Sequence, residues 1–329
     1  ESDEASTKEI LHISQKEKVA YSSQCIGDIL FDTGEFSRSL ESYDESLQLR
    51  KDSGADSLVI ADTLNKKGST LLKLKRWDEA ALSFNKALRI RVDRLSKDHI
   101  DIAQSFHFIG KAYQGHEKSD QALDYYKKAQ RIISGRLVDT DTHAADLFYD
   151  LGKIVLLQDE AAFHYTRASP PDDEISLALT CLALSRDIYI RNFGDDALEV
   201  GNALSLLGEI YHKYGEVVKA ISSYKRALSI FKGAPLDQSR RIRKTLVKLG
   251  LAIIDISPDD GVEVFDCYSL AQALYEEKED YKNVEYADLI FFIGEAHLQF
   301  GKKADLPYFN YCPYYNSNKV VFVSLSRGL

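Results

Sequence analysis

The chain has 329 residues, of which 44% are hydrophobic and 28% are charged, a composition that supplies both a core and a well-solvated surface. The formal net charge is −9, with Lys and Arg interspersed among Asp and Glu, which argues against nucleic acid as a partner and favours a basic peptide. The four cysteines stand far apart, which argues against a zinc site or a disulfide framework, and no apolar run reaches the roughly 20 residues of a membrane span.

These features favour a cytoplasmic protein in a reducing compartment. The chain starts at Glu1 and contains no methionine, so we interpret it as a trimmed segment. Residues 1–18 are predicted to be a polar N-terminal segment followed by a short helix, because Ile10, Leu11 and Ile13 form an apolar stripe there. This helix either caps the array that follows or completes a repeat that begins upstream.

Residues 19–304 contain one glycine that recurs inside helical patterns. The intervals between successive copies are 41, 42, 42, 56, 42 and 44 residues. A nearly fixed period in this range is typical of a solenoid of stacked helix pairs. The positions are Gly27, Gly68, Gly110, Gly152, Gly208, Gly250 and Gly294.

A second pattern, small-x-x-x-aromatic-x-x-small, begins twelve residues after most of these glycines. Ala80, Phe84 and Ala87 are one copy. The pattern starts 14 residues late in the fourth unit and two residues late in the sixth, which accounts for the two longer intervals. Small residues let two helix backbones approach closely, and the aromatic ring fills the space between them. We therefore expect about seven helix-turn-helix units in an all-α solenoid.

The pattern resembles the tetratricopeptide repeat, and its cleanest copy is Leu207-Gly208-x-x-Tyr211 followed by Ala220, Tyr224 and Ala227. The 42-residue period and the segments Ala87–Arg91 and Asp98–Ala103 are similar to the kinesin light chain subtype. The resemblance implies a right-handed superhelical solenoid that acts as a protein-interaction scaffold, in which the first helix of each pair lines a concave face. That subtype carries paired asparagines shortly before the glycine, and Asn65 is the residue that matches.

Two segments interrupt the predicted array. Residues 158–174 are expected to form an inserted loop within the fourth unit, because Pro170-Pro171 disfavours a helix. Residues 305–329 change abruptly to an irregular, aromatic tail in which residues 320–323 resemble a strand.

No catalytic constellation is recognisable. The chain has no phosphate-binding loop, no His-Glu-x-x-His and no Gly-x-Ser-x-Gly, and its histidines do not share a helix face. We therefore predict that the protein is not an enzyme and needs no cofactor or metal.

The residues six and three before each glycine, and one and four after it, share one face of the first helix. We expect this face to point into the concave groove and to bind an extended peptide through polar side chains and a few apolar anchors. The candidate groove residues are Gln24, Asp28, Asn65, Ser69, His107, Lys111, Tyr149, Lys153, Ser205, Glu209 and His212.

The leading functional hypothesis is a scaffold that binds a peptide segment or a partner subunit in this groove. One alternative is a cargo adaptor like the kinesin light chains. Another is a non-catalytic regulatory or assembly subunit of a larger complex, docked through its convex face or its tail.

Overall fold

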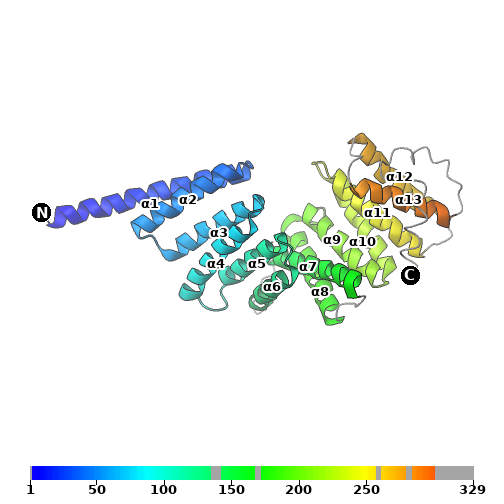
Figure 1. Cartoon of the computed structure of the whole chain (residues 1–329), viewed down its shortest axis with the longest axis horizontal. Helices are drawn as coiled ribbons and strands as arrows, with labels where there is room; N and C mark the ends of the chain where they lie inside the picture. Colours follow the sequence, from blue (N-terminus) through cyan, green and yellow to red (C-terminus); the bar gives the residue numbers. More distant parts are fainter. Residues whose placement is uncertain (1, 135–141, 167–171, 257–260, 279–283, 301–329) are drawn as a thin grey trace. The chain divides into compact units, whose positions relative to one another are not determined.

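The computed structural model describes residues 2–134, 142–166, 172–256, 261–278 and 284–300, and every regular element in these ranges is an α-helix (Figure 1). The all-α prediction is therefore confirmed for the described part of the chain. The helices are α1 Ser2–Asp32, α2 Phe36–Ser53, α3 Ser57–Lys73, α4 Trp77–Arg94, α5 Ile100–Gly115, α6 Ser119–Ser134, α7 Thr142–Thr166, α8 Asp172–Phe193, α9 Leu198–Lys213, α10 Val217–Gly233, α11 Ser239–Ile256, α12 Val262–Glu277 and α13 Val284–Gln299.

The helices form hairpins in chain order, as the repeat predicts, from α1 with α2 to α11 with α12. Six of the predicted glycines lie in the first helix of a pair. The seventh, Gly294, lies in α13, which begins the seventh repeat. A Cβ added to Gly68 would lie 2.5 Å from Cε1 of Phe84. The glycine is thus the place where the aromatic ring of the second helix sits directly on the backbone of the first.

Short polar residues and glycines set where the helices begin and end. The Asp56 carboxylate accepts a hydrogen bond from the backbone N–H of Leu58 at 2.9 Å and so caps α3. The Nδ1 atom of His99 accepts one from the N–H of Asp101 at 3.2 Å and caps α5. Gly54 ends α2 with a positive φ of 70°, a conformation that costs glycine little.

Two predicted boundaries are replaced by continuous helices. α1 runs without a break from Ser2 to Asp32, so residues 1–18 do not form a separate capping helix. The reason is that this segment contains no proline, and its first glycine is Gly27.

α7 likewise continues to Thr166, and α8 begins at Asp172, so most of the predicted loop at 158–174 is helical. No proline or glycine occurs between Gly152 and Pro170 to stop α7 earlier. Residues 167–171 and the predicted tail at 305–329 lie outside the described residues.

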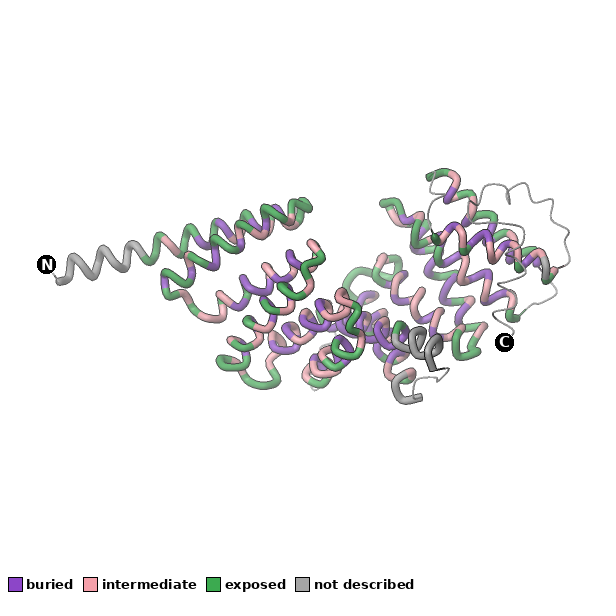
Figure 2. Tube along the Cα trace, viewed as in Figure 1, coloured by how far each residue is buried: buried purple, intermediate pink, exposed green. Residues whose placement is uncertain are grey.

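The chain divides into two compact units, which we call unit 1 (residues 1–195) and unit 2 (residues 196–329). Buried residues line the facing sides of the helices within each unit (Figure 2). In unit 1, one core cluster joins Leu71, Ala80 and Phe84 to Ile109 and Ala112. In unit 2, a larger cluster of buried residues joins α10 through α13.

Candidate functional site

Unit 1 contains an open groove of about 810 Å³, lined by α1, α3 and α5 with contributions from α2 and α4. We call it the inner groove. Its wall combines aromatic, amide, acidic and basic side chains. The lining residues are Tyr21, Gln24, Asp28, Phe31, Asp32, Tyr43, Arg50, Val59, Asp62, Asn65, Lys66, Ser69, Arg91, Gln104 and Phe108.

Four of the eleven candidate residues line the inner groove, namely Gln24, Asp28, Asn65 and Ser69. They belong to the first two repeats. In these repeats, the positions counted from the glycine therefore identify the inner surface of α1 and α3. Tyr21 lines the same groove and is 63% exposed, which makes it a large aromatic surface open to solvent.

The polar groups on the α1 side of the groove are held by contacts to the next helices. Asp28 accepts hydrogen bonds from the Tyr43 hydroxyl and from Nζ of Lys66, both at 2.6 Å. Burial and the neighbouring Asp28 carboxylate raise the pKa of Tyr43, so this phenol stays protonated and donates. Gln24 accepts from Arg50 at 2.5 Å, and its side-chain oxygen lies 3.2 Å from the Thr63 hydroxyl.

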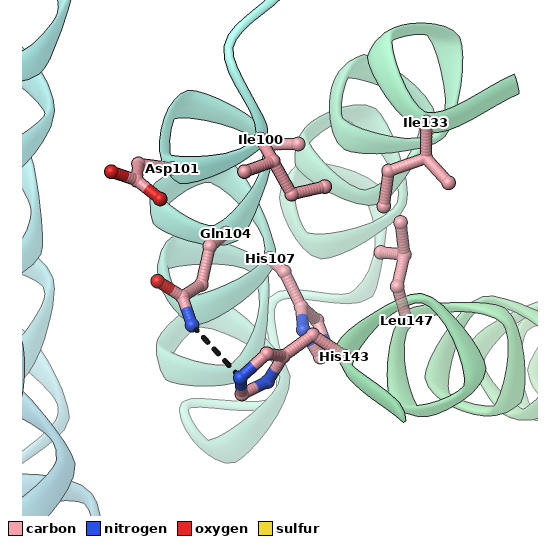
Figure 3. A pocket seen from close by; sticks show the side chains of 8 residues that line it. Ile100, Asp101, Gln104, His107, Ile133, His143 and Leu147 are labelled. Atoms are coloured by element: carbon pink, nitrogen blue, oxygen red, sulfur yellow. Dashed lines mark hydrogen bonds between the residues drawn. The ribbon is translucent and has the colours of Figure 1, made fainter. Parts of the chain in front are cut away.

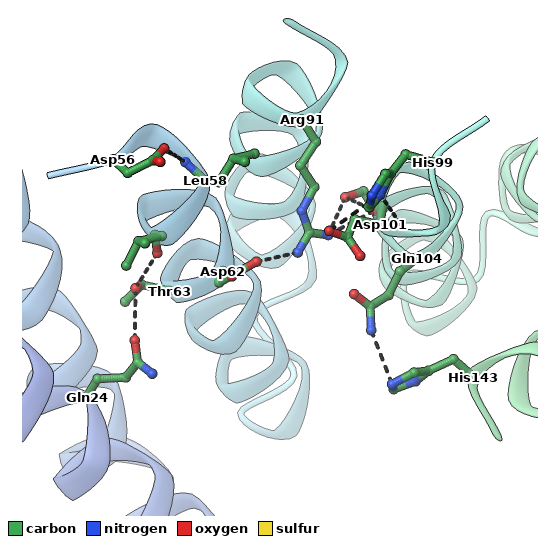
Figure 4. Close-up of polar contacts among 12 residues, drawn as sticks. Gln24, Asp56, Leu58, Asp62, Thr63, Arg91, His99, Asp101, Gln104 and His143 are labelled. Carbon is green, nitrogen blue, oxygen red and sulfur yellow. Dashed lines mark hydrogen bonds and ion pairs between the residues drawn. The ribbon is translucent and has the colours of Figure 1, made fainter. Parts of the chain in front are cut away.

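Asn65 is engaged within the protein, although it lines the groove. It is 6% exposed, and its side-chain oxygen accepts from both terminal nitrogens of Arg91 at 2.6 and 3.0 Å. Arg91 also donates to Asp62 at 2.7 Å and to Ser105 at 2.9 Å (Figure 4 shows the Asp62 contact). Asn65 therefore helps to orient a buried guanidinium and offers little surface to a ligand.

His107 was predicted to face the groove, but it is a core residue. It is 4% exposed, and its Nε2 atom lies 2.9 Å from Oδ2 of Asp150 in α7. Lys111 approaches the same carboxylate at 3.3 Å. Burial works against the charge of Asp150, but the hydrogen bond from His107 and the charge of Lys111 outweigh it and lower the pKa of Asp150.

His107 also lines a smaller cavity of about 210 Å³ between α5, α6 and α7 (Figure 3). Gln104 and His143 close its polar side, with 3.4 Å between their Nε2 atoms. Ile100, Ala103, Ile133 and Leu147 make the remaining wall mainly apolar.

The other candidate residues lie away from the inner groove. Tyr149 and Lys153 are partly buried on α7 of unit 1. Ser205, Glu209 and His212 lie on α9 of unit 2, where Glu209 pairs with Lys248 and His212 lies 2.8 Å from Asp255. The structure thus brings together four of the predicted residues in the inner groove, and the other seven lie outside it.

Sequence reasoning missed the two arginines that line the groove. Arg50 and Arg91 each stand 23 residues after the repeat glycine, and they are 5% and 3% exposed. Burial lowers the pKa of Arg50, but a guanidinium remains charged at any ordinary pH. Their shared position in the repeat is a signal that was present in the sequence.

A second missed signal is the 39-residue offset that links polar residues of successive first helices. It joins Glu209 to Lys248 in unit 2, and Asn202 to Arg241 at 3.0 Å. In unit 1 it joins Gln24 to Thr63, Gln104 to His143 and Lys111 to Asp150. Polar residues of successive first helices therefore contact each other across the repeats.

The described ranges contain no group of three or more His, Cys, Asp or Glu side chains that could hold a metal ion. None of their helices is both long enough and apolar enough to cross a membrane.

Comparisons with known proteins agree with the helix pairs. The tetratricopeptide repeat family matches residues 19–92, 60–134 and 174–233, which together make up more than half of the chain. The Arabidopsis thaliana protein KINESIN LIGHT CHAIN-RELATED 3 is 23% identical over 203 residues, or 60% of this chain. The chain spans only 29% of the length of that relative.

Two solved structures have similar folds. BtubC (BKLC) from P. vanneervenii aligns with a TM-score of 0.58 at 18% identity, over 75% of this chain and 91% of its own. PilF from Pseudomonas aeruginosa aligns with a TM-score of 0.56 at 14% identity, over 85% and 99%. At these identities the likeness concerns the fold.

Proposed function

The chain belongs to the tetratricopeptide repeat family, and from this premise we propose that it is a non-catalytic scaffold that binds an extended peptide segment of a partner protein in the inner groove. The observation that carries the proposal is the groove itself, whose wall places exposed aromatic surface beside amide and charged groups. Such a surface can anchor apolar side chains and hydrogen-bond to a peptide backbone.

Peptide binding would use the aromatic surface of the groove. Tyr21 and Phe31 stand on α1, and Phe108 stands on α5 across the groove. Aromatic rings bury a large area at a small cost in side-chain entropy, so they suit the anchoring of one or two apolar peptide residues.

Electrostatic attraction would also contribute to peptide binding. Lys66 is paired with Asp28, and Arg91 is paired with Asp62. Asp32, which also lines the groove, is an exposed acidic group beside these pairs. Together with the net charge of −9, this favours a peptide that carries basic residues next to its apolar anchors.

The proposal can be tested with a random peptide library selected against the chain. Selected peptides should be apolar and basic, and their affinity, measured by fluorescence anisotropy, should fall about tenfold or more in Tyr21→Ala and in Ser69→Lys. Val218→Ala is a matched control, because Val218 is 72% exposed on α10, in unit 2. If the selected peptides bind both groove variants as tightly as the original chain, the inner groove is not the binding site.

A narrower role, as a cargo adaptor in the cytoplasm, is a second candidate. It is supported by the 42-residue repeat and by the name of the Arabidopsis thaliana relative. Co-precipitation with a purified kinesin heavy chain tests the adaptor role. If a chain shortened at residue 304 no longer binds the heavy chain, the contact is made through the tail. That result would favour the role of an assembly subunit.

A further inference from the structure

One side of α1 carries an exposed apolar stripe in unit 1. It consists of Val19, Ser22, Ile26 and Ile29, which we call the α1 outer face. Val19 is 50% exposed, Ile26 is 52% exposed and Ile29 is 64% exposed. Their spacing of three, four and seven residues places them on one side of the helix, away from the inner groove that Gln24 and Asp28 line.

The same positions are buried in α5 and α7, whereas on α3 two of the four, Ile60 and Lys67, are only partly buried. The four positions stand eight, five and one residue before the repeat glycine, and two residues after it. In α5 and α7 all of them are 3% exposed or less, and they are Ile102, Ser105, Ile109, Ala112, Ala144, Leu147, Leu151 and Ile154.

In α5 and α7 these buried positions are covered by the second helix of the preceding repeat. α4 packs against α5, and Ala80 and Phe84 of α4 share one core cluster with Ile109 and Ala112 of α5. The Phe84 ring also stacks on Phe108, with 5.2 Å between the ring centroids. The stripe on α5 resembles the α1 outer face in chemistry, since it likewise combines aliphatic residues with one serine.

That serine takes part in a specific contact. Ser105 donates to the carbonyl of Asp101 and accepts from the Arg91 guanidinium of α4 at 2.9 Å. Thr63 holds the same position in α3, donates to the carbonyl of Val59 and accepts from Arg50 of α2.

Ser22 is the equivalent residue on α1. It donates to the carbonyl of Lys18 at 3.0 Å, just as Ser105 and Thr63 donate to the carbonyl four residues earlier. Its side chain therefore already has the conformation in which the other two hydroxyls accept from an arginine.

We propose that the α1 outer face binds an amphipathic helix of a partner protein, in the way that α4 covers α5. The partner helix would carry the pattern small-x-x-x-aromatic-x-x-small-x-x-x-Arg, which α4 carries as Ala80, Phe84, Ala87 and Arg91. Its small and aromatic residues would cover Ile26 and Ile29, and its arginine would donate to Ser22. This surface is separate from the inner groove.

The test uses the full chain and a labelled peptide with the sequence of α4, Trp77–Leu95. The peptide carries Leu82→Glu and is held helical by a lactam staple between that glutamate and Lys86, at two positions that α4 exposes. Fluorescence anisotropy should detect binding, and Ile29→Glu should weaken it about tenfold or more. Val218→Glu introduces the same charge at an equally exposed site in unit 2 and should leave binding unchanged.

A double-mutant cycle tests the arginine contact. Ser22→Ala should weaken the original peptide about fivefold and should not change the affinity of an Arg91→Gln peptide. Sedimentation velocity of the chain alone then shows whether a second copy of the chain covers this face. The proposal is overturned if the peptide does not bind, if Ile29→Glu and Val218→Glu act alike, or if the chain alone forms a dimer that Ile29→Glu dissociates, because a second copy would then cover this face.

Discussion

At the scale of single residues, the repeat glycines are defined by what a side chain would meet. A Cβ on Gly68 would lie 2.5–2.8 Å from three atoms of the Phe84 ring, and Phe84 is fully buried and has no room to move. Gly68→Ala gains about 1 kcal/mol of helix propensity but forces overpacking that costs about 1–3 kcal/mol. We expect a net loss of stability, measured by urea denaturation.

Gly233 provides the control for this substitution. It is the last residue of α10, and no heavy atom lies within 4 Å of the place where its Cβ would be. Gly233→Ala should therefore leave stability unchanged or raise it by up to about 1 kcal/mol. Equal destabilisation by the two substitutions would show that close packing at Gly68 is not the cause.

The carboxylate of Asp150 makes stability depend on pH. Because its folded-state pKa is lowered, its contribution is complete above the unfolded value of about 3.9 and is lost as the pH falls through the folded value. Asp150→Asn should destabilise the chain by about 1–3 kcal/mol at pH 7. The difference from the original chain should shrink below about pH 4 in urea denaturation series, and a constant difference down to pH 2 would contradict the assignment.

At the scale of helices, Arg91 connects three elements. From α4 it reaches Asp62 and Asn65 on α3, and Ser105 on α5. Arg91→Leu removes these contacts and leaves buried acceptors behind, so we expect a loss of about 2–4 kcal/mol in the free energy of unfolding.

Arg89 is the matched control, because it lies one half-turn away on α4 and is exposed. Arg89→Leu should change stability by no more than about 0.5 kcal/mol. If both leucine variants unfold at the same urea concentration as the original chain, the buried arginine contributes no net stability.

The helix boundaries show where local patterns are sufficient. The start of α3 is readable in the sequence, because Asp56 is a good capping residue and indeed caps that helix. The length of α7 is not readable in the same way, because the delayed second pattern resembles an inserted loop although no residue before Pro170 stops the helix.

At the scale of the whole molecule, the chain consists of two compact units, and each has a core of its own. A fragment of residues 1–195 should therefore fold alone. We expect it to show a strong helical circular dichroism signal and a cooperative urea transition. An unfolded fragment would mean that unit 1 needs residues 196–329 for its stability.

The sequence by itself determined the helix pairs, because the glycine, the small residues and the aromatic ring recur with a period that depends only on local contacts within each unit. It also determined which face of α1 and α3 lines the inner groove. Only the tertiary structure decided which polar residues remain available there. Asn65 is occupied by Arg91 and His107 by Asp150. These partners lie 26 and 43 residues away, and side-chain burial depends on how neighbouring repeats pack rather than on any local spacing.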